Sequence, residues 1–182
     1  LLIIVLFLNM STQAQDEAEP KKSGFDKSKL FFGGNFGMSF GDVTFINISP
    51  QVGYQFNQFF AAGAGINFIS TGYTYRDYNG DKLFKDSYGY AGLNVFGRVF
   101  PLPFLFAQLQ PEYNYSWGKT KYYNGQPDQK LGDAFVPVLL VGAGAAIPAG
   151  RGRMFAMLQY DLIGDARSPY GRNPFLTCGY NF

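Results

Sequence analysis

The sequence has no histidine, a single cysteine and few charged residues. Its 182 residues include 15 Lys and Arg and 13 Asp and Glu, which is 15% charged residues and a formal net charge of +2. Without histidine, the chain lacks the usual general base of Ser-His-Asp and Cys-His sites and the commonest zinc ligand. The lone Cys178 cannot form an intrachain disulfide, and we interpret it as a small apolar filler. The low net charge, with no stripe of Lys and Arg, predicts no nucleic-acid partner.

A membrane-spanning helix is also not expected. The best candidate, residues 134–150, contains seventeen uncharged residues, which is the lower bound for crossing a bilayer. Pro137, Gly142 and Gly144 weaken this segment as a helix, and β-branched residues crowd its first half. A helical span there would also leave the rest of the chain unexplained.

The N-terminal stretch LLIIVLFLNMSTQAQ has the pattern of a secretory signal. Leu1 to Leu8 supply the apolar centre, and Thr12 and Ala14 are small enough for the −3 and −1 cleavage positions. We predict that residues 1–14 are a signal peptide truncated at its start, 15–28 a periplasmic tail, and 29–182 the folded domain. The alternative, a buried strand, is disfavoured because residues 16–24 are strongly polar.

Aromatic residues and glycine are abundant instead, and apolar side chains recur at every second position. Aromatics make up 19% of the chain, and there are 23 glycines. A period of two indicates β-strands. It appears in eight segments, at about 30–40, 44–56, 59–71, 88–100, 104–117, 134–147, 153–162 and 175–182. Segment 134–147 alternates poorly because both of its faces are apolar or small.

These segments predict an all-β fold, an eight-stranded antiparallel up-and-down transmembrane β-barrel. Segments of about nine to thirteen residues suit tilted strands that cross a bilayer. Every second connection is tight, near 57–58, 101–103 and 148–152, whereas 72–87 and 118–133 are long. Short turns at one end and longer loops at the other are typical of outer-membrane barrels.

The apolar face of each strand is predicted to contact lipid and the polar face to line the lumen. In lipid every backbone polar group needs an internal partner, which a closed sheet supplies. Side chains fill the interior of an eight-stranded barrel, so we expect a plugged lumen. A soluble sandwich or lipocalin-like barrel is the alternative, and its interior would be apolar. The predicted lumen network comprises Asn35, Asn47, Gln51, Asn67, Asn94, Arg98, Gln110, Glu112, Gln159 and Asp161.

Aromatic residues near the segment ends are predicted to lie at the membrane interfaces. Three prolines, Pro50, Pro111 and Pro137, lie inside predicted strands. Because each removes one hydrogen bond from the ladder, we expect local bulges there. The predicted interfacial aromatics are Tyr54, Tyr115, Trp117, Tyr160, Tyr180 and Phe182.

Two inward carboxylates, Glu112 and Asp161, are the only candidates for acid–base chemistry. A buried carboxylate must be paired, so we expect a structural ion pair with Arg98 rather than catalysis. The glycine runs at 33–37, 63–65 and 142–144 match no complete phosphate-binding fingerprint, and we interpret them as packing positions. We therefore predict no catalytic, cofactor-binding or metal-binding residue.

The two long connections each contain an Asn-Gly pair. Asn79-Gly80 and Asn124-Gly125 predict type I′ turns that close projecting hairpins. Residues 77–81 have the spacing of half a calcium loop but lack the distal glutamate, so a metal is not expected. Plain solvated hairpins are one interpretation, and docking of a partner protein or a glycan is the other. The candidate contacts are Tyr73, Tyr75, Tyr78, Tyr122 and Tyr123.

Residues 29–56, KLFFGGNFGMSFGDVTFINISPQVGYQF, resemble the small outer-membrane β-barrel proteins of Bacteroidota. The resemblance lies in the Gly-aromatic spacing and the I-x-x-x-P-Q-x-G-Y run, and it covers about residues 29–182. It implies the barrel architecture and an outer-membrane location, but little about activity. It also implies that the barrel-assembly machinery reads Tyr180 and Phe182 during insertion.

We therefore expect a non-enzymatic integral protein of the bacterial outer membrane. Its expected role is structural, as an interaction protein or an accessory subunit of a larger outer-membrane complex. The expected partners are outer-membrane lipid, the barrel-assembly machinery and other outer-membrane proteins, and no cofactor is expected. A narrow pore or a small-ligand-binding barrel is the alternative.

Overall fold

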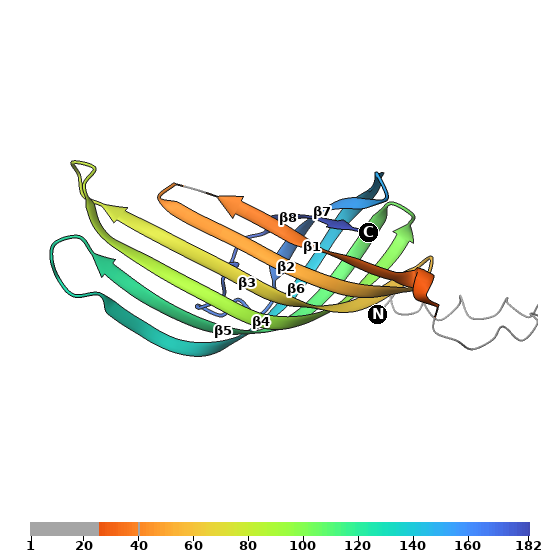
Figure 1. Cartoon of the computed structure of the whole chain (residues 1–182), viewed down its shortest axis with the longest axis horizontal. Coiled ribbons are helices and arrows are strands. Elements are labelled where there is room, and N and C mark those ends of the chain that lie inside the picture. The colour runs from red at the N-terminus through yellow and green to blue at the C-terminus, as the bar shows by residue number, and fades with distance from the viewer. Residues whose placement is uncertain (1–25, 40) are drawn as a thin grey trace, which may run out of the picture.

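The computed structural model describes residues 26–39 and 41–182. Within these ranges, eight antiparallel strands pair in chain order and close into a barrel (Figure 1). The predicted signal peptide, residues 15–25 of the predicted tail and residue 40 lie outside the described residues. The strands are β1 (Leu30–Ser39), β2 (Val43–Asn57), β3 (Phe60–Arg76), β4 (Lys82–Leu102), β5 (Leu105–Tyr122), β6 (Gln129–Ala149), β7 (Gly152–Asp161) and β8 (Phe175–Asn181). The prediction of an all-β, eight-stranded up-and-down barrel is therefore confirmed.

A short 3-10 turn, η2 (Lys27–Lys29), precedes β1. Its N-cap Asp26 accepts hydrogen bonds from the Ser28 hydroxyl (2.7 Å) and the Ser28 backbone N–H (3.0 Å). These bonds stabilise the carboxylate and hold the pKa of Asp26 below its usual value. Among the described residues, no helix is long and apolar enough to cross a membrane.

The strands are unequal in length, so one side of the barrel extends further than the other. Strands β3 to β6 contain 17 to 21 residues, whereas β7 contains 10 and β8 only 7. The hairpins β3–β4 and β5–β6 project beyond the rest of the barrel (Figure 1). Most residues of the two predicted long connections belong to these strands. Cross-strand aromatic pairing continues past the wall, as in the stack of Tyr75 on Phe84 with ring centroids 4.4 Å apart.

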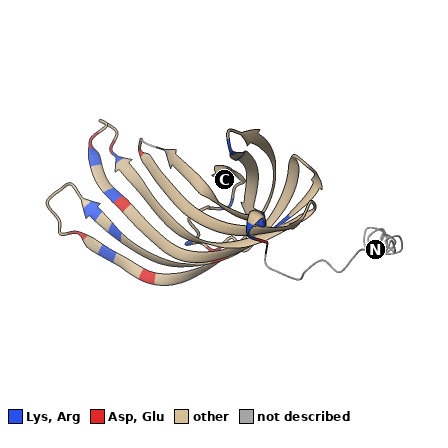
Figure 2. Cartoon of the chain, turned by 45° about the vertical axis from the view of Figure 1, so that its right-hand side comes forward, with Lys and Arg blue, Asp and Glu red and all other residues tan. Residues whose placement is uncertain are grey.

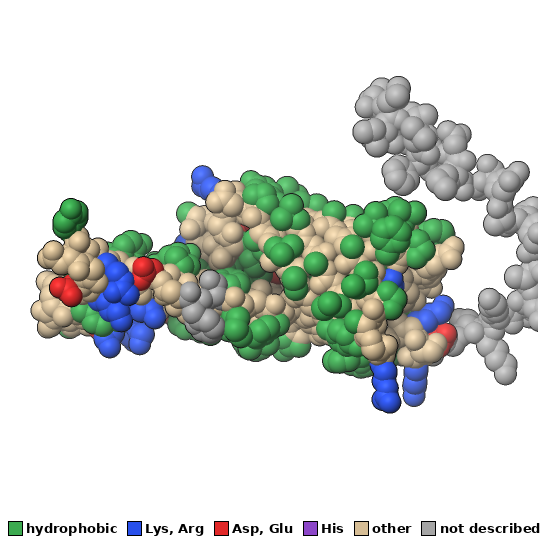
Figure 3. Space-filling view, turned by 90° about the horizontal axis from the view of Figure 1, so that it is seen from above, with side chains coloured by type: hydrophobic (Ala, Val, Ile, Leu, Met, Phe, Trp, Pro, Cys, Tyr) green, Lys and Arg blue, Asp and Glu red, His purple; other side chains and the backbone are tan. Residues whose placement is uncertain are grey.

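The barrel is apolar outside and largely polar inside. Leu93, Leu109 and Leu158 are 68%, 50% and 56% exposed on the outer wall. Their neighbours along the chain, including Asn94 and Gln110, are buried inside. Apolar side chains cover much of the wall (Figure 3), and the charged residues of the long strands lie mainly on the projecting hairpins (Figure 2). This distribution excludes the apolar interior of a soluble barrel.

The interior also holds two apolar clusters that period-two analysis did not single out. One contains Phe100, Phe106, Phe155 and Met157 near the short turns. The other is formed by Val136, Val138 and Leu140 of β6. Segment 134–147 alternated poorly because β6 presents apolar side chains to the lumen as well as to the outer wall.

The expected bulges at the prolines are wrong. Beside Pro50 and Pro111 two positions of one neighbouring ladder are unpaired, but the register is the same on both sides. Pro137 precedes the part of β6 that pairs with β7, which begins at Leu140. A missing N–H thus costs local pairing only, because the other neighbour keeps the strand in register. The register shifts lie instead at Gln55/Asn57, Tyr75/Arg76, Val99/Leu102 and Ser116/Gly118.

The barrel closes at a short seam between β1 and β8. Three residue pairs align there, Gly33 with Asn181, Gly34 with Tyr180 and Asn35 with Gly179. A Cβ on Gly179 would lie 2.4 Å from the backbone oxygen of Gly34 and 2.3 Å from the Phe155 ring. The glycine therefore lets the closing strands and an interior aromatic ring approach each other.

Candidate functional site

The polar lumen is organised by β5, whose even-numbered residues all face inward. Because side chains alternate along a strand, Gln108, Gln110, Glu112 and Asn114 form one continuous row. Arg98 Nε of β4 donates to Gln108 Oε1 (2.5 Å), and Gln108 Nε2 donates to Gln110 Oε1. Gln110 Nε2 then donates to Glu112 Oε1 (2.6 Å). Each amide accepts on the side of the guanidinium and donates on the side of the carboxylate.

The row continues on the far side of Glu112 through asparagines. Asn114 Nδ2 donates to Glu112 Oε2 at 3.1 Å. Asn114 Oδ1 accepts from Asn67 Nδ2 (3.2 Å), and Asn67 Oδ1 accepts from Asn94 Nδ2 (2.6 Å). Glu112 is thus the acceptor on which two oriented chains of amides converge.

The expected ion pair between Arg98 and a lumen carboxylate is wrong. Within the described residues the ion pairs are Arg76–Asp42 and Arg167–Asp165, both on the surface. Arg98 is 2% exposed, and its guanidinium carbon lies 4.7–5.3 Å from the ring centres of Phe96, Phe106 and Phe155. Arg98 pairs with Gln108 in the β4–β5 register, and Glu112 lies four residues further along β5. Gln108 and Gln110 therefore lie between the guanidinium and the carboxylate.

The β7–β8 loop, residues 162–174, supplies side chains to the lumen that the sequence analysis missed. Tyr170 OH donates to Glu112 (3.0 Å to Oε2), and its ring stacks on Phe175 with centroids 4.7 Å apart. Ser168 Oγ donates to Asp161 Oδ2 at 2.7 Å. The composition of this loop, with Gly, Ser, Pro and Arg, is also that of a solvated loop. Only its tyrosine indicated from the sequence that part of the loop could face inward.

Asp161 is held by the backbone as well as by Ser168. Its Oδ1 accepts from the N–H groups of Leu139 (3.3 Å) and Ile163 (3.1 Å). Glu112 and Asp161 therefore each have three donor residues and need no cation, since hydrogen bonds to a carboxylate replace its hydration.

All ten predicted lumen residues are buried in the interior, but they do not form one network. Asn47 accepts from the Ser49 hydroxyl (2.7 Å), and Gln159 accepts from the Thr177 hydroxyl (2.6 Å). Several buried polar atoms have no hydrogen-bond partner among the described residues, and such atoms need water or a ligand. They are Asn35 Oδ1, Gln51 Nε2 and Oε1, Asn94 Oδ1, Arg98 Nη2 and Gln159 Nε2.

The predicted interfacial aromatics divide between the two ends of the barrel. Tyr54, Tyr180 and Phe182 lie near the short turns, where the backbones of Phe182 and Phe32 exchange hydrogen bonds of 2.7 and 3.3 Å. Trp117, Tyr115 and Tyr160 lie toward the longer loops. The Tyr115 hydroxyl donates to Asp133 at 2.8 Å.

The candidate contact tyrosines lie on the two projecting hairpins. Tyr73 and Tyr75 are about half exposed on β3, and Tyr78 at the hairpin tip is fully exposed. On the second hairpin, the ring of Tyr123 lies within 6 Å of two ammonium groups, those of Lys82 (5.8 Å) and Lys121 (5.6 Å). The fifth, Tyr122, is partly buried at the end of β5.

The type I′ prediction for the Asn-Gly turns is wrong. Gly80 has φ of +90° and Gly125 of +85°, but no non-glycine residue that the structure describes has positive φ. At the first tip Asp77 accepts hydrogen bonds from the N–H groups of Asn79 and Asp81, both 2.9 Å. The Asp77 carboxylate thereby orders the turn, and glycine takes the left-handed position after it.

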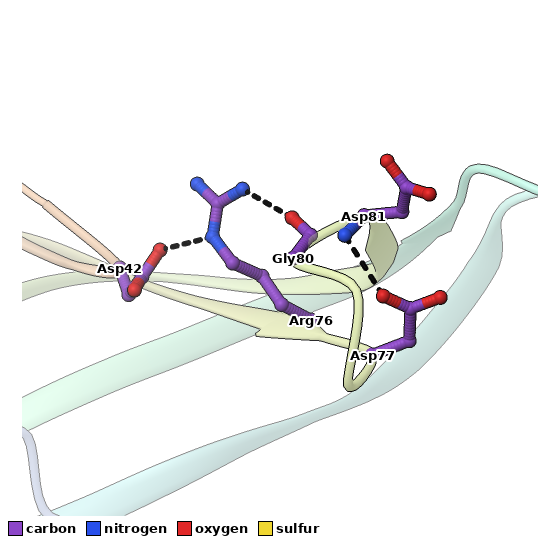
Figure 4. A network of polar contacts seen from close by, with 5 residues as sticks. All are labelled: Asp42, Arg76, Asp77, Gly80 and Asp81. Atoms are coloured by element: carbon purple, nitrogen blue, oxygen red, sulfur yellow. Dashed lines mark hydrogen bonds and ion pairs between the residues drawn. The ribbon is translucent and has the colours of Figure 1, made fainter.

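A surface ion pair braces the first hairpin against the β1–β2 loop (Figure 4). Arg76 Nε donates to Asp42 Oδ1 at 2.8 Å, and Arg76 Nη1 donates to the Gly80 carbonyl at 3.0 Å. No cluster of three or more potential metal-ligating side chains occurs among the described residues. The acidic tip is thus a structured turn.

Comparison with known structures finds distant similarity of fold. No protein-family model matches the sequence, and no curated protein sequence matches it significantly. The fold is similar to that of Ail, the attachment invasion locus protein of Yersinia pestis. The two are 14% identical with a TM-score of 0.43, and the alignment covers 84% of this chain and 95% of Ail. A similarity this distant carries no functional argument.

Proposed function

We propose that this chain is a non-enzymatic integral barrel of the bacterial outer membrane that acts as an interaction protein. The observation that carries the proposal is the exposed apolar wall around a polar interior. In water, large side chains such as Phe32, Phe68 and Leu176, each at least 50% exposed, would be an aggregation surface. In lipid the same wall would contact hydrocarbon, and pairing of β1 with β8 closes the sheet so that backbone groups at the seam are hydrogen-bonded.

The proposed lumen is plugged rather than conducting. The β7–β8 loop lies against Glu112 and Asp161 through Tyr170 and Ser168. Below it, the amide row of β5 and the two apolar clusters occupy the interior. An interior of eight strands holds about one layer of side chains across, so these groups leave little room for a solute path.

The proposed contact surface is the pair of projecting hairpins, and the proposed partner is another protein of an outer-membrane complex, to which this chain is an accessory subunit. The hairpins combine exposed tyrosines with charges of both signs, such as Lys85 and Asp86. Tyrosine favours protein contacts because it offers a large, rigid contact area and loses little conformational entropy when it is ordered on binding. The Arg76–Asp42 pair and the Tyr75–Phe84 stack hold this surface in one shape before a partner binds.

A small-ligand-binding barrel is the second candidate. It is favoured by the buried polar atoms of Gln51 and Arg98 that have no partner among the described residues. These atoms require water or a ligand, so part of the lumen is a potential binding site.

Two experiments test the proposal. In native membranes, the protein should resist extraction by urea or carbonate and should copurify with a defined partner in mild detergent. Tyr73→Ser with Tyr75→Ser should reduce partner recovery, whereas the matched outer-wall change Tyr113→Phe should not. In planar bilayers the pure protein should give no discrete current steps. Extraction without detergent would refute the membrane assignment, and stable current steps would refute the plug.

A further inference from the structure

The turn end of the barrel contains a cavity with an unusual charge distribution. It has a volume of about 310 Å³, and its lining includes four cationic side chains, Lys29, Arg98, Arg151 and Arg153. Among the described residues, no Asp or Glu side chain lines it. This volume lies at the lower end of the range for small-molecule sites.

Among the described residues, the hydrogen-bond partners of Lys29, Arg98 and Arg153 in this cavity are neutral. Lys29 Nζ donates to the Phe56 carbonyl (3.3 Å), and Arg153 donates to the Pro103 carbonyl. With the Asn181 amide oriented to satisfy both its polar atoms, its oxygen accepts from Arg98 Nη1 at 3.0 Å. The other terminal nitrogen, Arg98 Nη2, is buried with no hydrogen-bond partner among the described residues. A buried guanidinium without a counter-charge is costly, so this site is incomplete.

The rest of the wall is aromatic. Phe100, Phe106 and Phe155 line the cavity and are each at most 7% exposed, and Phe31 packs against them. Of these rings, Phe106 and Phe155 also lie beside Arg98, with ring centres 5.3 and 4.8 Å from its guanidinium carbon. An occupant must therefore present an anionic group to Arg98 and an apolar portion to the rings.

We propose that this cavity binds a small organic carboxylate with an apolar portion. The carboxylate accepts from Arg98 Nη2, the apolar portion packs on the phenylalanine rings, and the three outer cations draw the anion to the mouth. This site goes beyond the proposed interaction role, which uses the opposite end of the molecule. A phosphate group could satisfy Arg98 equally well, but free phosphate would leave the aromatic wall without a partner.

The test uses the full chain in nanodiscs of zwitterionic lipid, with benzoate as the probe and backbone amide NMR shifts as the readout. Benzoate should cause saturable shifts at residues of the turn end, and neutral benzyl alcohol and inorganic phosphate should each bind at least about tenfold more weakly. Arg98→Met should weaken benzoate binding by roughly tenfold or more, whereas Arg98→Lys should retain most of it because the charge remains. Arg76→Gln, a cation at the other end, is the matched control and should leave the affinity unchanged.

The other outcomes decide against the proposal or distinguish a free ligand from a lipid headgroup. If benzoate bound wild type and Arg98→Met with equal affinity, the cavity would be an apolar void without anion recognition. The same would follow if wild type bound benzoate and benzyl alcohol with equal affinity. Phosphate binding as tight as benzoate would remove the role of the rings. In discs containing phosphatidylglycerol, unchanged benzoate affinity supports a free ligand, whereas loss of benzoate binding would assign the cavity to a lipid headgroup. None of these results depends on whether the hairpins recruit a partner.

Discussion

The two halves of the lumen differ in how completely their buried charged groups are hydrogen-bonded. On the loop side, Glu112 and Asp161 each accept hydrogen bonds from three residues, including Tyr170 and Ser168 of the β7–β8 loop. On the turn side, Arg98 has neutral acceptors, three aromatic rings and one terminal nitrogen without a partner among the described residues. The loop side is a completed structure, whereas the turn side is a site that can accept an anion.

This contrast teaches that burial alone does not identify a binding site. Glu112 and Arg98 are buried to a similar degree, at 5% and 2% exposure. They differ in their hydrogen-bond partners, because a satisfied buried charge rigidifies its surroundings and an unsatisfied one needs water or a ligand. The predictions that follow are ordered by the size of the expected effect on stability.

Gly179→Val should have the largest effect, because it acts on the seam that closes the barrel. A Cβ there meets the Gly34 backbone and the Phe155 ring, so the strands must separate or the ring must move. We expect a loss of about 3 kcal/mol or more, measured by urea unfolding in lipid vesicles. Gly132→Ala, where a Cβ meets nothing within 4 Å, is the control. A near-neutral Gly179→Val would show that the seam is not tightly packed.

Glu112→Ala should destabilise the loop side by about 2–4 kcal/mol. The change leaves Gln110, Asn114 and Tyr170 without their common acceptor. The same unfolding assay measures it, and Glu112→Gln should recover part of the loss because one acceptor oxygen remains. A cost below that of an ordinary surface substitution would mean that the amide row is not a cooperative network.

Tyr170→Phe should cost about 1 kcal/mol, since it removes one hydrogen bond and keeps the stack on Phe175. Hydrogen exchange of the β7–β8 loop should rise while exchange in β3 and β4 stays the same. Arg167→Gln, which alters an exposed cation of the same loop, should not change the exchange. Unchanged loop protection in Tyr170→Phe would contradict the assignment of Tyr170 as its anchor.

Arg98→Met should have the smallest effect, within about 1 kcal/mol of wild type and far below that of Glu112→Ala. The change removes the desolvation cost of a buried cation that lacks a counter-charge, and this offsets the loss of its hydrogen bonds to Gln108 and Asn181. The comparison is made in the absence of added anions, by the same unfolding assay. A loss as large as that of Glu112→Ala would show that Arg98 is already fully satisfied, and the two halves of the lumen would no longer differ.

The sequence contains the information for the strands and their faces, because alternation is a local property. Strand number, the tight turns and the inward placement of residues such as Asn94 and Gln110 follow from it. Partner choice inside the lumen depends on register between strands, which period two does not encode. Arg98 therefore faces Gln108 rather than a carboxylate, and Tyr170 reaches Glu112 across 58 positions of the chain.

The hairpins show a second limit of the same kind. Residues 72–76 and 118–122 are glycine, polar or aromatic residues, so they lack the alternation that marks a half-buried strand. They are nevertheless strands, because each pairs with its neighbour and the tips are closed by ordered turns. Where paired strands extend beyond the apolar wall, neither face has to be hydrophobic, so the sequence shows no alternating pattern there.

The central claim is that lipid surrounds the outer wall, and spin-label accessibility tests it most directly. In a Cys178→Ser background, labels at Leu93→Cys, Leu109→Cys and Leu158→Cys are compared with Tyr78→Cys at a hairpin tip, in lipid vesicles. The three wall labels should collide frequently with oxygen, which concentrates in hydrocarbon, and rarely with a water-soluble nickel complex, and the tip label should behave in the opposite way. Frequent nickel collisions at all three wall positions would place that wall in water and contradict the account.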